Sequence, residues 1–597
     1  MSTVNVNEAI ARARQIIADK QAAILAKKLA AEQAAANAIN LTIATPLTVE
    51  HQNRAVGGMQ WNEEQQTAID YAVYRKSFCL IGAAGTGKTT TLKGAIKAMQ
   101  EQNVLPMLES STKFLAAGSP GIALISYTRR AVRNMAKQMP PELKDHCITF
   151  HKLVQYEPVR YVAWNQETLK DETTVRFEPT KHQGNPLPRN LRVIIVEESS
   201  MLSTDYFKQV IDALPNPSQV QFIFLGDLNQ LPPVYGQAIL GKKLLELPII
   251  ELTRVYRQAL ESPIISMALA VKNNDFSQFQ RDAVDVFGVS PKFMYGDGRP
   301  NNPINYAASF DPASIKEKTV LEKAGRGKVT LHPWKKNLTQ EDGLDRMQMQ
   351  TRMWIKSGEY DPNEDLVLCP WNKSFGTDEL NKSIADFLGR ERGALVYEVI
   401  AGYEKHYLAV GDKLMVDKQE CLVTAIDWNP KYLGKRPQPA HKDLTRWGML
   451  PSHANMFTEE HAMTNADVDA MLEHAATVDD RVTACSHVLK VRFLDSGEED
   501  TIADAVTINL SSFAYAITVH KAQGSECRRV FIILHSCHAA MCSRELIYTA
   551  ITRAAEELYI VMPPNLLASA ARKPRIKGDT LAAKLEYFNS RFEEKAE

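Results

Sequence analysis

A glycine-rich segment, Gly82-Ala-Ala-Gly-Thr-Gly-Lys88-Thr89, constrains the fold of this chain more than any other feature. The apolar run 78–81 before it is typical of a buried strand, and the pattern from Thr89 to Met99 is typical of a helix. Glycines at a strand-to-helix turn let backbone N–H groups surround phosphates at the positive end of the helix. The segment therefore predicts a nucleotide-binding loop in a parallel α/β domain.

The residues of this loop are the first candidates for contact with a nucleotide and Mg²⁺. Lys88 is expected to reach the outer phosphates, and the Thr89 hydroxyl is a candidate Mg²⁺ ligand. The other candidates in the loop are Gly82, Ala83, Ala84, Gly85, Thr86, Gly87 and Thr90. Kinases, GTPases, transporters and motors share such loops, so the loop predicts nucleotide binding and leaves the reaction open.

The composition is that of a globular protein with several domains. Its 597 residues correspond to about four domains, and 45% hydrophobic with 23% charged residues is ordinary usage. Seventy Lys and Arg balance seventy Asp and Glu, so any attraction to nucleic acid has to come from local patches. No apolar stretch is typical of a membrane span or signal core, and we expect a reduced, cytoplasmic protein.

A group of cysteines and histidines near the C-terminus does not have the spacing of a metal site. The group consists of Cys527, His535, Cys537, His538 and Cys542. It contains no C-x₂-C pair, and the run 530–534 inside it is typical of a buried strand. The sequence therefore predicts no zinc site here.

Two further apolar runs of the α/β region end in polar residues. The run 191–196 precedes Glu197 and Glu198, and the run 221–225 precedes a segment that contains Gln230. Ligands of open parallel sheets collect at the C-terminal ends of the strands. One carboxylate can hold Mg²⁺ through water while the other polarises an attacking water, and Gln230 can contact the γ-phosphate or that water.

These segments belong to a series that resembles superfamily 1 helicases, within the branch of phage Dda and bacterial RecD, over nearly all of Trp61 to Met562. The matching elements are Gln65 of an adenine-reading motif, Gly82 to Thr89, Ser126 to Ala131, Thr149 to His151, Glu197 to Met201, Gly226 to Pro233, Leu252 to Gln258, Thr518 to Glu526 and Tyr548 to Arg553. The resemblance implies an ATP-dependent DNA helicase that moves 5′ to 3′ on single-stranded DNA, in replication, recombination or repair.

The resemblance also implies the domain organisation, an α/β fold with two RecA-like parallel-sheet domains. We expect an Ala-rich helical extension at 1–58, a first core at 59–250 with a hairpin insertion at about 155–190, a second core from 251–397 and 506–570, an inserted β-barrel-like subdomain at 398–505 and a helical tail at 571–597. The N-terminal helix, at 7–40, either packs loosely on the body or docks a partner.

The family's motifs assign further roles in the ATP site. Arg257 and Arg553 of the second core are expected to neutralise charge on the transferred phosphoryl group. Tyr256 and Gly524 are expected to line the nucleotide. Glu197 stands where the family usually has aspartate, on the Mg²⁺ side, and Glu198 stands at the position of the general base. Because Mg²⁺ keeps several waters, it can tolerate the longer side chain of Glu197.

Nucleic acid is expected to lie across both cores. Thr128, Arg129 and Arg130 are candidates for phosphates, and Thr518 and His520 belong to a strand-contacting motif. The candidates for stacking on bases are Phe150, His151, Tyr235 and Trp371. A solvated helix face and buried core rings are the alternatives for the charged and aromatic candidates, respectively.

The two insertions carry strand-like patterns. The runs 159–163 and 173–177 predict a hairpin, which is either the pin that separates the duplex or a structural element. The runs 408–416 and 489–493 predict strands of the second insertion, whose basic loop either touches DNA or is solvated.

The expected partners are a DNA fork and single-strand-binding or replisome proteins, and the protein is expected to act as a monomer. An RNA helicase of the same superfamily and a single-strand-binding protein with a vestigial ATPase remain the alternatives.

Overall fold

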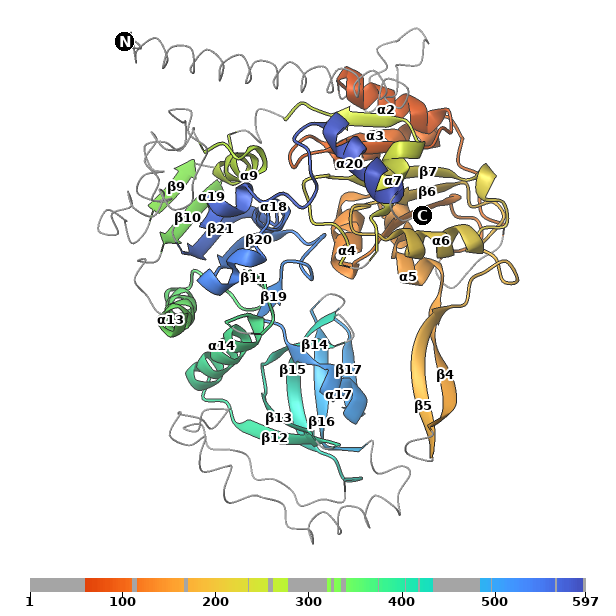
Figure 1. The fold of residues 1–597 in the computed structure, drawn as a ribbon. Helices are drawn as coiled ribbons and strands as arrows, with labels where there is room; N and C mark the ends of the chain where they lie inside the picture. The colour runs from red at the N-terminus through yellow and green to blue at the C-terminus, as the bar shows by residue number, and fades with distance from the viewer. Residues whose placement is uncertain are drawn as a thin grey trace, which may run out of the picture.

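The computed structural model describes most of the chain between residues 60 and 593 (Figure 1). The described ranges are 60–109, 115–165, 170–234, 236–255, 261–276, 319–323, 327–333, 340–373, 375–402, 404–416, 419–432, 484–494, 497–563 and 566–593. The expected N-terminal helical extension therefore lies outside the described residues. No helix within these ranges is long and apolar enough to cross a membrane.

The first core is a six-stranded parallel sheet in the order β3-β2-β6-β7-β1-β8. Its strands are β1 (Phe78–Gly82), β2 (Ile122–Ser126), β3 (Cys147–Thr149), β6 (Val193–Val196), β7 (Gln221–Gly226) and β8 (Ile249–Leu252). Helices α2 (Glu63–Val73), α3 (Lys88–Glu101), α4 (Arg129–Gln138), α5 (Phe150–Leu153), α6 (Thr204–Ala213) and α7 (Ile239–Glu246) surround it, with the 3₁₀ turns η2 (Pro141–His146) and η3 (Pro217–Gln219).

Both faces of this sheet are covered, as a parallel sheet requires. Leu80 packs in the cluster that contains α2 and α3, whereas its neighbour Ile81 packs in the cluster that contains α6 and α7. This burial on two sides explains why β1, β6 and β7 appear in the sequence as continuous apolar runs rather than as alternating patterns.

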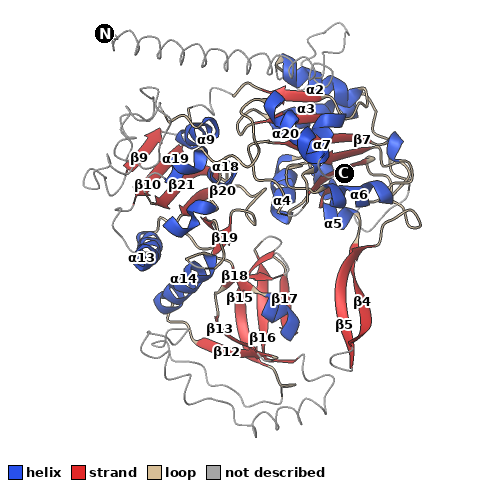
Figure 2. Cartoon of the chain, viewed as in Figure 1, coloured by secondary structure: helices blue, strands red, loops and turns tan. Residues whose placement is uncertain are grey.

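The second core is another six-stranded sheet, in the order β19-β11-β20-β21-β10-β9 (Figure 2). Its strands are β9 (Thr319–Lys323), β10 (Gly327–Pro333), β11 (Leu366–Cys369), β19 (Ala516–Thr518), β20 (Cys527–Ile533) and β21 (Ala554–Met562). Only β9, at one edge, pairs antiparallel. Its helices are α9 (Pro263–Asn273), α13 (Gln340–Ser357), α14 (Thr377–Glu391), α18 (Arg544–Ile551) and α19 (Leu566–Ala571), with η6 (Ser536–Ala540). The two sheets confirm the predicted α/β class.

A long antiparallel hairpin leaves the first core between α5 and β6 (Figure 1). It consists of β4 (Tyr156–Asn165) and β5 (Lys170–Pro179), so the runs expected at 159–163 and 173–177 are parts of longer strands. The hairpin projects away from the sheet of the first core, past the insertion of the second core.

The insertion in the second core is a seven-stranded antiparallel sheet. It contains β12 (Val396–Ala401), β13 (Glu404–Ala409), β14 (Lys413–Val416), β15 (Gln419–Trp428), β16 (Ala484–Phe493), β17 (Glu499–Asp504), β18 (Ser512–Phe513) and α17 (Ala505–Leu510). The single strand expected at 408–416 is wrong, because the chain turns between β13 and β14. Gly411 has a φ of 86°, and the Asp412 carboxylate accepts a hydrogen bond from the Ala409 N–H at 2.7 Å.

The last helix, α20 (Leu581–Glu593), returns to the first core. It follows the second core in sequence, yet it packs beside α7 (Figure 1). The helical tail expected after residue 571 is therefore part of the first core's packing.

Candidate active site

The glycine-rich loop joins the end of β1 to the start of α3. Gly85 and Gly87 have φ values of 79° and 86°, a region that other residues rarely adopt. A Cβ atom on Gly82 would lie 2.5 Å from the Thr86 hydroxyl, so a larger residue would disturb the turn. Gly87 supplies no side-chain cap to α3. The first N–H groups of the helix are therefore left for an anion, as in a phosphate site.

Lys88 lies against the loop that it follows. Its Nζ donates to the carbonyl oxygens of Gly82 and Ala83, at 2.7 and 3.0 Å. It lines the same cleft as Thr89, Glu197 and Glu198. A bound phosphate at the helix start would compete with these carbonyls for the ammonium group.

The two carboxylates follow β6 at the C-terminal end of the sheet. Burial, and then the charge of Glu198, raise the pKa of Glu197 to about 8, although Lys88 and Arg553 oppose the shift. Glu198 has a φ of 50°, and the next residue, Ser199, is fixed by two hydrogen bonds to Leu225 O. The chain therefore turns sharply at this position, which presents both carboxylates to the cleft.

The oxygen atoms in this cleft are suitable ligands for Mg²⁺. Glu197 and Glu198 line the cleft together with Thr89, and the lining contains no cysteine or histidine. Among the described residues no group of three or more His, Cys, Asp or Glu is placed to hold a metal. Mg²⁺ does not need such a group, because it binds through one or two carboxylates, waters and substrate phosphates.

Arg553 enters the cleft from the second core. It is buried, and it donates to Thr549 O and Ser525 O at 3.1 Å each. Its Nη1 lies 3.7 Å from Glu198 Oε1. With its amide oriented to satisfy both neighbours, Gln230 donates to Glu198 Oε2 at 2.9 Å and accepts from Arg553 Nη2 at 3.2 Å. The structure thus brings Glu198, Gln230 and Arg553 together.

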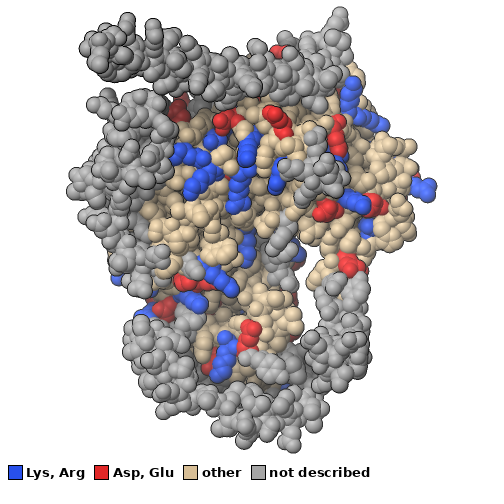
Figure 3. All heavy atoms as spheres, in the orientation of Figure 1, with Lys and Arg blue, Asp and Glu red and all other residues tan. Residues whose placement is uncertain are grey.

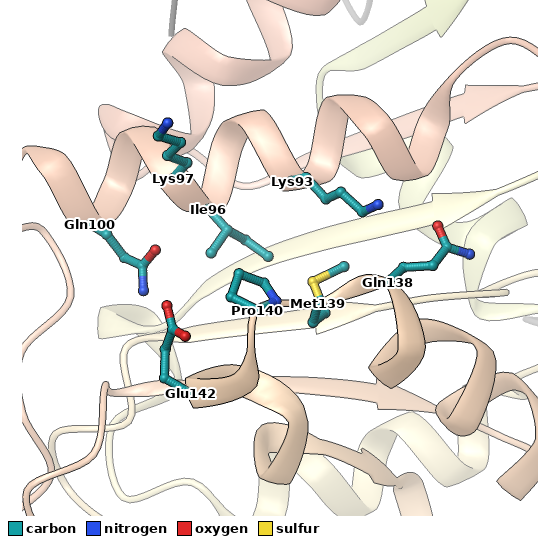
Figure 4. Close-up of a pocket in the computed structure, with 8 residues that line it drawn as sticks. All are labelled: Lys93, Ile96, Lys97, Gln100, Gln138, Met139, Pro140 and Glu142. Carbon is teal, nitrogen blue, oxygen red and sulfur yellow. The ribbon is translucent and has the colours of Figure 1, made fainter. Parts of the chain in front are cut away.

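The cleft has a volume of about 170 Å³ and is lined by both cores. The first core contributes Lys88, Thr89, Glu197, Glu198 and Gln230, and the second core contributes Gly524, Ser525, Glu526, Thr552 and Arg553. A larger hollow of about 500 Å³ lies beside α3 and the end of α4 (Figure 4). That hollow shares only Gln138 with the cleft and includes none of the loop from Gly82 to Thr89, so we assign the nucleotide to the smaller cleft.

Tyr548 joins the nucleotide-binding loop to the second core, a role that sequence reasoning missed. Its buried hydroxyl accepts from the Ala84 N–H at 2.9 Å and donates to Asp227 Oδ2 at 2.7 Å. The sequence shows only a tyrosine within an apolar helix and an aspartate directly after β7, which could have indicated a buried hydrogen bond. The two residues are 321 positions apart, so the sequence alone could not show that they meet.

Thr128 and Gly524 lie where the two cores touch. Thr128 Oγ1 caps α4 and also donates to Gln523 O at 3.2 Å. A Cβ atom on Gly524, whose φ is 75°, would lie 2.4 Å from the Ala131 Cβ. Gly524 therefore permits a close approach of the second core to α4, which accounts for glycine at this position.

Other candidates for the nucleotide site have less direct placements. The Gln65 side chain completes a capping box at the start of α2, where its Oε1 accepts from the Asn62 N–H at 3.2 Å. Its proposed contact with adenine stays a prediction. Tyr256 and Arg257 lie outside the described residues.

The aromatic candidates for base stacking differ in exposure. Phe150 is 0% exposed and packs in the first core, so its assignment as a stacking residue is wrong. It sits at the start of α5 with its ring turned toward Tyr156 and Tyr206, and no ring face is left for a base. Trp371 is 44% exposed and stays a candidate. His151 is partly buried among the same aromatic rings, and Tyr235 lies outside the described residues.

The polar candidates for contact with nucleic acid also differ in exposure. Arg129 is exposed, whereas Thr518 is buried at the end of β19. Burial, and then the charge of Arg575, lower the pKa of His520, so its ring is neutral near pH 7. On the face drawn in Figure 3, Lys and Arg are interspersed with Asp and Glu, as the balanced net charge suggests.

Arg130 is paired with an acidic residue of the insertion. Its guanidinium forms an ion pair with Glu420 on β15, and Lys413 Nζ lies 3.4 Å from the other Glu420 oxygen. Both cations lower the pKa of the Glu420 carboxyl against the effect of its burial. In this structure the pair ties α4 to the insertion, and the contact of Arg130 with DNA stays a prediction.

Removal of the Glu420 charge is expected to destabilise the protein. Glu420→Gln leaves two largely buried cations without their counter-ion, which costs about 3 kcal/mol or more. We expect a lower midpoint of urea unfolding, measured by tryptophan fluorescence, to which Trp428 of the insertion contributes. Glu499→Gln, an exposed site on β17, is the matched control and is expected to change little. Equal midpoints for both variants would contradict a stabilising role of the ion pair.

An AAA domain matches residues 65–236, and a UvrD-like helicase C-terminal domain matches residues 513–561. The ATP-dependent RecD2 DNA helicase of Deinococcus radiodurans is 25% identical over 516 residues, which are 86% of this chain and 51% of that protein. The chain thus spans about half the length of this relative.

Two further matches are similar in extent. The RecBCD enzyme subunit RecD of Mycolicibacterium smegmatis is 21% identical over 88% of this chain and 75% of that protein. The crystal structure of Pif1 helicase from Candida albicans aligns with a TM-score of 0.39 and 14% identity, covering 89% of this chain and 100% of that chain. The family and sequence matches confirm the predicted resemblance to superfamily 1 helicases of the RecD type.

Proposed function

From its RecD-like relatives and the geometry of the cleft, we propose that this chain is an ATP-dependent DNA helicase or translocase of superfamily 1. ATP is hydrolysed between the two cores, and the resulting movement advances the protein along a single strand. One observation carries the proposal: Glu198 and Gln230 of the first core meet Arg553 of the second core in the cleft that Lys88 also lines. A site shared by two cores couples the state of the nucleotide to their relative position.

The residues of the first core bind ATP and prepare the water. Lys88 binds the outer phosphates, and bound Mg²⁺ supplies further neutralisation of phosphate charge. Thr89 and Glu197 would hold Mg²⁺, the latter through water. Glu198 orients the attacking water and accepts its proton, since it is the carboxylate closer to the second core's arginine.

The second core supplies the arginine that stabilises the transition state. Arg553 stabilises the charge that grows on the transferred phosphoryl group, and Gln230 links it to Glu198. Phosphate release removes the anion that these groups share, and the cores then separate. Arg257 is proposed as a second arginine at the same phosphate, by its resemblance to the family motif alone.

Single-stranded DNA is the proposed track, across the cores and the insertion. Exposed Arg129 and Trp371 are suited to a phosphate and a base, respectively. The 5′ to 3′ direction, action as a monomer, and work at a replication or repair fork with single-strand-binding or replisome proteins rest on the resemblance. So does the proposed cytoplasmic location in a bacterial or phage-infected cell.

The hairpin of β4 and β5 is the proposed pin that separates the duplex. It projects from the first core as a two-stranded arm (Figure 1). Each stacked step of duplex costs about 1.4 kcal/mol to open, so a rigid wedge needs only to block reannealing. A purely structural hairpin is the alternative, and a shortened turn that leaves unwinding unchanged would favour it.

Unwinding assays test the proposed function directly. Duplexes with a 5′ tail or a 3′ tail, made of DNA or of RNA, are offered to the wild-type protein with ATP and Mg²⁺. We expect strand separation of the 5′-tailed DNA duplex alone. Unwinding of RNA would favour an RNA helicase, and unwinding from a 3′ tail would reverse the direction.

A second candidate function is a single-strand-binding protein with a feeble ATPase. The observation that favours it is Glu197, which lines the cleft on the proposed Mg²⁺ side and is one methylene longer than the usual aspartate. ATP hydrolysis with and without single-stranded DNA separates the two candidates. Strong stimulation by DNA excludes the passive binder.

Glu197→Asp is expected to preserve or improve Mg²⁺-dependent hydrolysis. The shorter side chain keeps the carboxylate and leaves room for another water on the ion. A titration of the ATPase rate with Mg²⁺ checks this, and Glu197→Gln, which removes the charge, is the comparison. A loss of activity in the aspartate variant would mean that the cleft is built around the longer side chain.

A further inference from the structure

The C-terminal helix α20 is an integral part of the first core, although its sequence follows the second. Leu585 and Phe588 are buried in the apolar cluster that contains α6 and α7. Phe588 lies so close to α7 that a Cβ atom on Gly241 would be 2.7 Å from its ring. The chain therefore crosses from the second core, which ends with α19, back to the first core and is fixed there.

One buried lysine of α20 points at the loop after β7. Lys584 is only 9% exposed, and its Nζ donates to Asn229 Oδ1 at 2.7 Å and to Leu228 O at 3.3 Å. A lysine is rarely buried, because desolvation of the ammonium group is costly unless hydrogen bonds offset it. The two oxygen acceptors supply that compensation, so the side chain is held in place.

The loop that Lys584 contacts carries Gln230. Asp227 Oδ1 accepts from the Asn229 backbone N–H at 2.9 Å and from its side-chain amide at 2.8 Å. Asp227 Oδ2 accepts from Tyr548, which also contacts Ala84 of the nucleotide-binding loop. A continuous chain of hydrogen bonds thus leads from Lys584 to the nucleotide-binding loop.

The other end of the loop is held by the second core. Leu231 N donates to Thr549 Oγ1 at 3.0 Å, and Leu231 O accepts from Gln523 Nε2 at 2.9 Å. Gln230 therefore lies between an anchor on α20 and anchors on the second core. Its position relative to Glu198 depends on all of them.

We propose that α20 is a strap that fixes the loop from Asp227 to Leu231, and that Lys584 is a positioning residue for ATP hydrolysis. The inference rests on the proposed function, because it assigns Lys584 to the same reaction. Lys584 is not among the residues that line the cleft; it sets the place of Gln230 between Glu198 and Arg553. Small errors in the position of such groups lower the rate much more than they weaken binding.

Lys584→Met tests this proposal, with Lys577→Met as the matched control on the exposed part of the same tail. In Lys584→Met we expect kcat for ATP hydrolysis to fall about tenfold or more, with KM for ATP changed less than about twofold. Lys577→Met is expected to match the wild type. Unchanged kcat in Lys584→Met, or an equal loss in both variants, overturns the proposal.

Asn229→Ala approaches the same contact from the loop and leaves the packing of α20 intact. If Lys584 acts through Asn229, the double variant should lose little more kcat than either single variant. Independent losses that multiply would overturn the positioning role. Because Asn229→Ala keeps the lysine and the helix, it also answers the question if Lys584→Met fails to fold.

Two separate measurements distinguish a failure of the positioning role of Lys584 from a failure of the proposed helicase function. Basal hydrolysis without DNA reports on the loop and Lys584, whereas unwinding of tailed duplexes by the wild type reports on the helicase. If the wild type hydrolyses ATP but does not unwind DNA, the helicase proposal is wrong, and the effect of Lys584 on ATP hydrolysis can still be measured. If the wild type unwinds DNA and Lys584→Met hydrolyses ATP at the wild-type rate, only the proposed role of α20 and Lys584 is wrong.

Discussion

Lys88→Ala is expected to abolish ATP turnover while single-stranded DNA binding remains largely intact. Lys88 is the cation of the first core that we propose binds the outer phosphates, and its ammonium group lies against the Gly82 and Ala83 carbonyl oxygens of the loop. Loss of one such preorganised donor costs roughly two to three orders of magnitude in rate. The rate of phosphate release and the binding of a labelled oligonucleotide are the two measurements.

The control for this variant is Lys97→Ala, nine positions further along α3. Lys97 forms an exposed pair with Glu101 at 3.8 Å, an interaction that contributes little to stability. The control is expected to hydrolyse ATP normally. If the Lys88 variant still unwinds DNA, the nucleotide has been assigned to the wrong place.

Arg553→Ala is expected to lower kcat by about three orders of magnitude, the effect typical of an arginine finger, with a much smaller loss of ATP affinity. Arg553 faces Glu198 and Gln230, where we propose that charge develops in the transition state. A group that acts mainly in the transition state changes kcat more than nucleotide binding. Steady-state kinetics and direct ATP binding are measured together.

Two further variants sharpen the assignment of Arg553. Arg553→Lys keeps the charge and loses the planar fork, so partial activity separates the contribution of charge from that of geometry. Arg528→Ala removes an exposed arginine that lies 3.9 Å from Glu556 and is the matched control. Equal losses of affinity and turnover in Arg553→Ala would argue against the role of a finger, and its melting temperature shows whether folding is the cause.

Local sequence was sufficient for the elements of the nucleotide site. A strand, a glycine turn and a helix follow each other within the range 78–101, so their geometry depends on nearby residues. The acidic pair at the end of β6 was equally visible, because a buried parallel strand is a continuous apolar run. The resemblance then supplied the second core and Arg553, which no local pattern could have linked to Lys88.

The sequence was less informative where burial or ion pairing depends on the whole fold. Phe150 looks like an aromatic ring beside a strand-contacting motif, and only the packing of α5 shows that the ring is covered. Arg130 looks like part of a basic helix face, and its partner Glu420 lies 290 residues away. The tail helix was expected, but its site of packing was not.

By itself the sequence determined the α/β elements, the phosphate loop and the acidic strand end, because each depends on residues that are neighbours in the chain. Only the tertiary structure decided which distant groups share the cleft: Arg553 with Glu198, Tyr548 with Ala84 and Asp227, and Lys584 with the loop that carries Gln230. The physical reason is that buried polar groups must find hydrogen-bond partners, and these partners come from whichever segment the packing of the apolar faces brings near.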